Sequence, residues 1–183
     1  MEQRITIRYA TLADSNFIAT IVCMAMGYDT SHPIFPVFEE LARHEHSQYS
    51  WRNTLIAEVD GVSAGAVVGY DGALLATLRE PIFPLIERHL GETPTIEDET
   101  EAGEFYLDSV GVLPEYRGLG IGTMLVNAVI DKAFTQGHQR VGLIVDVENH
   151  SAEKLYTSLG FEYVGNKRFL GQPMHHLQRR RNM

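Results

Sequence analysis

The chain has 183 residues, 44% hydrophobic and 21% charged, with 15 Lys and Arg against 24 Asp and Glu. Folding of such a chain buries about 70% of its unfolded surface, so a core and a substrate cleft can form without disulfides, which the single Cys23 excludes. The net charge of -9 repels phosphate backbones and argues against a nucleic-acid-binding protein. The sequence shows no apolar run of about eighteen residues and no secretion signal, so we expect a cytoplasmic protein without a membrane partner.

The N-terminal part of the chain is expected to form one strand followed by two helices. Residues 4–10 alternate apolar and polar side chains, as a half-buried strand does. Apolar side chains then recur at helical spacing up to Gly27, which ends the predicted helix. Pro36 lies in the first turn of a second predicted helix, a position that suits its missing N–H group.

A hairpin and then an irregular segment follow. Asp60-Gly61, a dipeptide typical of two-residue turns, joins two predicted strands over 54–59 and 64–70. Residues 71–103 fit no simple alternation of strands and helices, except that 84–90 can form a short helix ended by glycine. We interpret about 71–103 as an insertion into one domain that spans 1–183.

From Glu104 onward, strand and helix patterns alternate, which is typical of an α/β arrangement. The predicted elements are a strand at 104–112, a glycine-rich turn at 117–122, a helix to Phe134, a strand at 141–147, a helix at 151–159 and a closing hairpin of 163–170 and 174–179. The sequence contains no internal repeat and no low-complexity linker, so one domain is sufficient.

The glycine-rich turn is the most informative segment. Gly118, Gly120 and Gly122 let the backbone curl closely around an anion before the following helix begins. The free N–H groups and positive dipole end of that helix, together with the guanidinium of Arg117, can converge on a phosphate or pyrophosphate. Glycines also serve tight turns that bind nothing, so the turn alone leaves a ligand undecided.

Two other phosphate-binding motifs are compared on spacing. A mononucleotide P-loop ends in Gly-Lys-Ser/Thr, and no lysine stands in this turn, so that interpretation fails. The dinucleotide fingerprint fits better, because a strand ending in Asp146 follows, but its third glycine position holds Thr123. An NAD(P)-binding oxidoreductase therefore stays a minor alternative.

Residues 117–122 match the Arg/Gln-x-x-Gly-x-Gly/Ala signature of the GNAT superfamily of acetyl-CoA-dependent N-acetyltransferases, and residues 149–161 resemble the second segment of that family. The likeness is specific over 104–165 and only topological before it. It implies an α/β (α+β) fold with a GNAT-like mixed, mostly antiparallel central sheet, helices on both faces and a V-shaped splay between two central strands. It further implies acetyl-CoA as co-substrate.

The resemblance also implies positions for the coenzyme. The pyrophosphate cradle would be formed by Arg117, Gly118, Gly120, Gly122 and Thr123, and the pantetheine arm would pair with the main chain of Val110 and Val112. Asn149 would contact the coenzyme arm, or simply cap the next helix. An amide near Asp108 or Ser109 would stabilise the oxyanion of a tetrahedral intermediate.

Acetylation of an amine requires a base, because an alkylamine is almost wholly protonated at neutral pH. Glu104 and Asp108 are candidates, since alternation places both on one face of their strand with Tyr106. Family members with a glutamate base have it at the position of Glu104. The resemblance likewise makes Tyr156 the general acid for the departing thiolate, although its helical spacing alone indicates a core residue.

Histidine pairs provide no convincing metal site. His44-Glu45-His46 and His175-His176 lack the i, i+4 histidine spacing or a cysteine partner, so we interpret them as surface histidines and expect no metal.

The expected function is direct acetyl transfer from acetyl-CoA to a primary amine of a small molecule or peptide. A non-catalytic acyl-CoA-binding sensor is the alternative. Between His89 and Tyr116 there are eight acidic residues and no Lys or Arg, and we hypothesise that this run attracts a cationic amine. The sequence leaves open whether the chain forms a homodimer.

Overall fold

The computed structural model describes residues 4–182, whose strands form a single seven-stranded sheet in the order β1-β2-β3-β4-β5-β7-β6. The strands are β1 (Ile5–Tyr9), β2 (Thr54–Val59), β3 (Val62–Asp71), β4 (Phe105–Val112), β5 (Arg140–Asp146), β6 (Glu162–Phe169) and β7 (Gln172–Arg180). Each strand predicted from alternation is present, within two residues of its predicted bounds.

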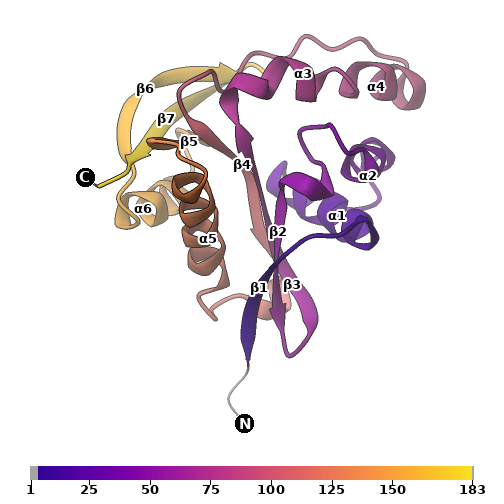
Figure 1. Ribbon diagram of the computed structural model, residues 1–183. Helices are drawn as coiled ribbons and strands as arrows, with labels where there is room; N and C mark the ends of the chain where they lie inside the picture. The colour runs from indigo at the N-terminus through magenta and orange to yellow at the C-terminus, as the bar shows by residue number, and fades with distance from the viewer. Residues whose placement is uncertain (1–3, 183) are drawn as a thin grey trace.

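The sheet divides between its two central strands. Neighbouring strands run antiparallel except β4 and β5, which are parallel and pair only at Phe105 with Val141 and at Tyr106 with Gly142. Beyond Tyr106 the two strands separate, and β5, β7 and β6 turn away from the rest of the sheet (Figure 1). The predicted fold class, including the V-shaped splay, is therefore confirmed.

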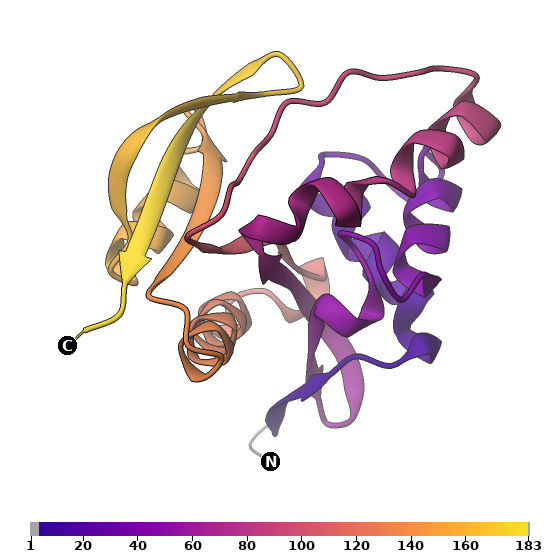
Figure 2. The same ribbon diagram turned by 45° about the horizontal axis from the view of Figure 1, so that its top comes forward.

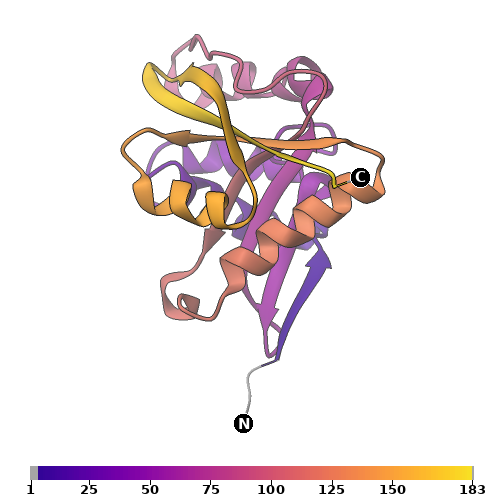
Figure 3. The same cartoon turned by 90° about the vertical axis from the view of Figure 1, so that its left-hand side faces the viewer.

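Helices cover both faces of the sheet (Figures 1 and 3). They are α1 (Ser15–Ala25), α2 (Phe35–Arg43), α3 (Leu75–Arg79), α4 (Ile82–Leu90), α5 (Ile121–Thr135) and α6 (His150–Ser158). One hydrophobic core lies beneath α5 and α6, and a second lies beneath α1, α2 and α4. Among residues 4–182, none of the helices combines the length and apolar character needed to cross a membrane.

The predicted insertion contains more helix than the sequence indicates. The helix expected over 84–90 is α4, and it ends as expected at Gly91, whose φ of 69° is left-handed. The five-residue helix α3 before it was not predicted, because so short a helix shows no clear periodicity. Residues 92–103, here called the strap, then run without regular structure from α4 across the molecule to β4 (Figure 2).

Candidate active site

A β-bulge and the splay expose part of the β4 backbone. Val68 of β3 pairs with Ser109 and its neighbour Gly69 pairs with Leu107, so Asp108 is an extra residue in β4. On the other side of β4, pairing with β5 ends at Tyr106. Main-chain groups of β4 beyond this point are available to an extended ligand that adds to the strand edge.

The glycine-rich turn leaves the first turn of α5 open. Gly118 and Gly120 have φ values of 81° and 77°, and no heavy atom lies within 4 Å of a Cβ built at either position. No side chain caps α5 at Gly120, so its first N–H groups point to the open space around the turn. Arg117 is exposed beside it and donates from Nε to the Val112 carbonyl over 3.3 Å. Together these groups could hold an anion.

Glu104 is engaged in a buried network. Its side chain is 1% exposed, and its carboxylate contacts Thr100 Oγ1 at 2.7 Å, His176 Nε2 at 2.8 Å and Gln178 Nε2 at 2.7 Å. A Cβ at Gly142 would collide with the carboxylate, so the glycine makes room for it. Burial by itself raises the pKa of Glu104, but hydrogen bonds from these three neighbours lower it below the ordinary value. The geometry therefore supports a structural role and gives no support to the predicted role of general base.

Replacing Glu104 by alanine is expected to lower the free energy of unfolding by about 3 kcal/mol at neutral pH, because three buried donors lose their acceptor. A carboxylate with a lowered native pKa stabilises above its unfolded pKa, and that contribution disappears as the pH falls. The loss should therefore shrink below the ordinary glutamate value of 4.5. Urea unfolding at about pH 7 and about pH 3 measures both effects.

Exposed Glu101, which precedes Glu104 in the chain, provides the control, and Glu101→Ala should change stability by less than about 0.5 kcal/mol. Glu104→Gln should retain most turnover. A folded Glu104→Gln protein with normal substrate affinity and no turnover would instead identify Glu104 as the base.

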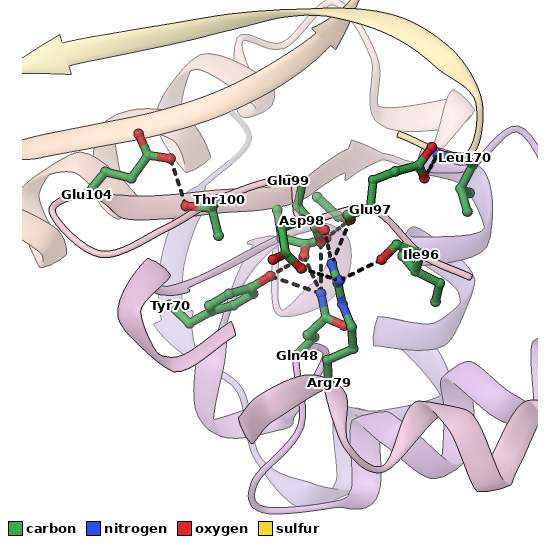
Figure 4. Close-up of polar contacts among 12 residues, drawn as sticks. Gln48, Tyr70, Arg79, Ile96, Glu97, Asp98, Glu99, Thr100, Glu104 and Leu170 are labelled. Atoms are coloured by element: carbon green, nitrogen blue, oxygen red, sulfur yellow. Dashed lines mark hydrogen bonds and ion pairs between the residues drawn. The ribbon is translucent and has the colours of Figure 1, made fainter. Parts of the chain in front are cut away.

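A second carboxylate approaches Asp108 from the strap. Tyr70 donates its hydroxyl to Asp108 Oδ2 over 2.8 Å, and Ser109 Oγ donates to Oδ1 over 2.9 Å. Gln48 Nε2 lies 2.9 Å from Glu99 Oε1, 3.0 Å from the Tyr70 hydroxyl and 3.5 Å from Asp108 Oδ2. One amide thus joins Glu99 to the Asp108 cluster, as Figure 4 shows for Gln48, Tyr70 and Glu99.

Burial raises the pKa values of both carboxyl groups. Burial is the largest cause for Glu99, the charge of Asp108 adds to it, and Arg79 opposes both, so the pKa rises to about 7. Burial also raises the pKa of Asp108, against hydrogen bonds from Tyr70 and Ser109. A carboxylate pair that accepts a proton near neutral pH suits general-base catalysis.

Arg79 of α3 fixes Glu99 and the strap. Its guanidinium forms an ion pair with Glu99, a second with Asp98 at 2.9 Å, and donates to the carbonyls of Ile96 and Glu97 over 3.2 and 3.1 Å. Figure 4 shows these contacts gathered around Arg79, with Glu104 set apart from them. The buried side chain of Arg79 therefore fixes the position of the Glu99 carboxylate on the strap.

Two adjoining cavities lie beside the carboxylate pair. The smaller, of about 140 Å³, lies at the splay, where Asp108 and Ser109 of β4 face Ile144 of β5. The larger, of about 270 Å³, lies between α2, α4, the strap and the β6–β7 turn. Both cavities are lined by Met26, Tyr49, Glu99 and Phe169. Glu99 therefore stands where the two cavities meet.

The remaining predicted residues lie around this site in different environments. Val110 and Val112 are half-buried on the part of β4 that pairs with β3 but no longer with β5, and Gly122 and Thr123 are half-buried in the first turn of α5. Asn149 caps α6, because its Oδ1 accepts from Ala152 N over 3.1 Å, which confirms its structural role.

Tyr156 packs in the core beneath α5 and α6 and makes an edge contact with Phe161. It is 9% exposed, and burial raises the pKa of its phenol to about 12. The phenol is therefore protonated at neutral pH, as a proton donor must be.

The histidine pairs differ from expectation in one respect. His176 is buried against Glu104, so its interpretation as a surface residue is wrong. His175 is half-buried and contacts Glu153 at 3.1 Å. Within residues 4–182, no group of three or more His, Cys, Asp or Glu side chains is placed to hold a metal ion.

Comparison with known proteins identifies the class to which this fold and site belong. The model of the Acetyltransferase (GNAT) family matches residues 23–161. The N-alpha-acetyltransferase RimI of Mycobacterium tuberculosis is 32% identical over 164 residues, which cover 90% of this chain and 82% of that protein. The chain therefore belongs to the GNAT family and is an acetyltransferase.

Solved structures agree with this assignment. A crystal structure of an acetyltransferase matches with a TM-score of 0.80 and 31% identity, over 96% of this chain and 98% of that one. The yncA protein of Salmonella typhimurium, solved with its cofactor acetyl-CoA, matches with a TM-score of 0.61 and 18% identity, over 96% and 93%. The second likeness concerns the fold alone.

Proposed function

We propose that this protein transfers an acetyl group from acetyl-CoA directly to a primary amine of a small molecule or peptide. The observation that carries the proposal is a single line of features: an uncapped helix end, an unpaired strand edge and a carboxylate pair. They follow one another along β4 and α5, in the order pyrophosphate site, pantetheine site and reaction centre.

The proposed coenzyme site uses main-chain groups and one cation. The pyrophosphate lies against the N–H groups of Gly118, Gly120, Gly122 and Thr123, with Arg117 beside it. The pantetheine arm pairs with the free edge of β4 at Val110 and Val112, and Asn149 lies near the arm. The yncA protein, which shares this fold, was solved with acetyl-CoA.

The reaction requires one proton acceptor and one proton donor. The neutral amine attacks the thioester carbonyl carbon, and the carbonyl oxygen takes the negative charge near the Asp108 and Ser109 amides of the bulge. The tetrahedral intermediate collapses to the amide by breaking the C–S bond. Before the attack, the carboxylate pair of Glu99 and Asp108 takes one proton from the bound ammonium and so produces the neutral amine. The departing thiolate takes the phenolic proton of Tyr156, and the resulting tyrosinate recovers, through solvent, the second proton that the nitrogen of the intermediate releases.

The cradle is tested by the matched pair Gly120→Ala and Gly137→Ala. Both glycines have left-handed φ values, 77° and 93°, and both leave open space at Cβ, so the two substitutions strain the backbone alike. Only Gly120 faces the proposed pyrophosphate. Acetyl-CoA at about 100 times its Kd stabilises the wild type by about 2.7 kcal/mol, which raises Tm by several degrees.

We expect Gly137→Ala to show the same rise in Tm and Gly120→Ala to show little or none at that concentration. Equal rises in both variants would contradict the proposed cradle. A wild-type protein whose Tm does not respond to acetyl-CoA, and which releases no thiol with any amine, would refute the proposed function.

A further inference from the structure

Building on the proposed acetyl transfer, we propose that the acceptor is a small primary amine with one compact apolar body, whose nitrogen lies at Glu99 and Asp108 and whose body fills the larger cavity. Polyamines and polypeptide N-termini are the acceptor classes that this arrangement disfavours.

The larger cavity is apolar over most of its wall. Phe38 of α2, Ile82, Ile86 and Leu90 of α4, and Ile96 of the strap all line it. An acceptor body placed there exchanges water for carbon contacts, and each buried methylene contributes to binding. A second ammonium group in the same space would lose its hydration without an ion partner.

The buried negative charge of this cavity lies at one end. Glu99 is 2% exposed and stands at the junction with the smaller cavity, where Asp108 lies. Glu92 also lines the cavity but is exposed to solvent, so its charge is hydrated and provides no desolvated anchor. An acceptor with a single amine and an apolar body matches this distribution, because its charged and apolar ends meet complementary walls.

The strap and the β6–β7 turn are joined to each other on one side of the cavity. The Glu97 carboxylate of the strap accepts from Leu170 N over 2.8 Å and from Gly171 N over 3.2 Å. These contacts tie the strap to the turn, and Phe169 and Leu170 of that turn line the cavity. Figure 2 shows the strap and the β6–β7 hairpin approaching each other across the top of the molecule. A polypeptide continuing from the reaction centre would have to pass this tie.

Four acidic side chains of the run between His89 and Tyr116 have partners within the protein. Glu97 binds the turn, Asp98 and Glu99 bind Arg79, and Glu104 binds the His176 network. These four carboxylates are less available to a cationic ligand, whereas Glu92, Glu101 and Glu115 of the run stay exposed. Recognition of the amine then depends on Glu99 and Asp108, the two members of the run that lie where the cavities meet.

The test is an acceptor panel with thiol release as the readout. The panel contains phenethylamine, isoamylamine, spermidine and a tetrapeptide with a free N-terminal methionine. We expect kcat/KM for the two apolar monoamines to exceed that for spermidine and for the peptide by at least about 10-fold, because the second charge and the continuing chain find no site.

Two matched pairs of variants test the apolar lining of the cavity and the contact between the strap and the β6–β7 turn. Leu90→Gln should lower kcat/KM for phenethylamine by about 10-fold and leave spermidine nearly unaffected, whereas Leu74→Gln, at an exposed position outside the cavity, should change neither. Glu97→Ala should raise the peptide-to-phenethylamine ratio of kcat/KM several-fold, and Glu101→Ala should leave that ratio unchanged.

The outcomes separate the two proposals. Preferred turnover of spermidine or the peptide by the wild type overturns the inference and leaves acetyl transfer intact. If the ratios of kcat/KM among the acceptors are unchanged in both Leu90→Gln and Glu97→Ala, the cavity lining and the strap–turn contact do not determine acceptor specificity, and this part of the inference is overturned. If no amine in the panel releases thiol above the rate of hydrolysis, acetyl transfer to amines is itself refuted.

Discussion

Replacing Asp108 by asparagine is expected to lower kcat/KM by about 10²- to 10⁴-fold, because the carboxylate pair loses the member that lies on β4. In the wild type, kcat/KM should rise with pH through about 7, where Glu99 loses its proton, and then level off. The profile reports the titration of the pair rather than of one residue. Glu99→Gln should remove this rise. Initial rates across the pH range, at saturating acetyl-CoA, measure both effects.

Tyr70→Phe provides the matched control, because it removes only the hydroxyl that donates to Asp108 over 2.8 Å. The pKa of Asp108 should then rise, since this hydrogen bond lowers it, and the acid limb of the profile should move to higher pH with little loss at the plateau. A pH profile that is the same in the wild type, Asp108→Asn and Glu99→Gln would contradict the assignment of the pair as base.

Removal of Arg79 is expected to cause the largest loss of stability. Arg79→Met leaves the buried carboxylate of Glu99 without its cation and should lower the free energy of unfolding by about 3–5 kcal/mol at about pH 8. Glu99 has a raised native pKa of about 7, so below that pH it is neutral and the missing cation matters less. The loss should therefore be smaller at about pH 5. Urea unfolding at the two pH values measures the difference.

Two further variants distinguish this role from general disruption. Arg43→Met removes an exposed ion pair with Glu39 of 2.8 Å and should change stability by at most about 1 kcal/mol. Arg79→Met combined with Glu99→Gln should recover part of the lost stability, because the uncompensated charge is gone. If the double variant is as unstable as the sum of the two single variants, the two residues are not coupled as the structure indicates.

The fold and the proposed coenzyme-binding part of the site can be predicted from local sequence. The sequence predicts every strand of the sheet, because alternating or continuous apolar runs bounded by turn residues mark each one. The turn from Gly118 to Gly122 is readable because left-handed backbone at Gly118 and Gly120 strongly favours glycine.

The proposed acceptor-binding part of the site can be predicted from the sequence only in part. Asp108 is a candidate from its place on the strand, but Glu99 lies in the strap, where no periodic pattern distinguishes it from its acidic neighbours. Arg79 lies on a helix too short to show a pattern. The sequence therefore places Glu104 beside Asp108 as a second candidate base, whereas the structure surrounds Glu104 with three hydrogen-bonding partners.

The acidic residues behind the net charge of -9 show the same division between what local sequence predicts and what tertiary contacts decide. Apart from the short helix α3, the sequence by itself determined the succession of strands and helices along the chain, together with the glycine-rich turn and the acidic run. Each of these depends on neighbouring residues and backbone geometry. Only the tertiary structure decided that Arg79, Gln48 and Tyr70 surround the pair of Glu99 and Asp108. Burial and charged neighbours set the pKa values of that pair, and both come from segments that are distant in sequence.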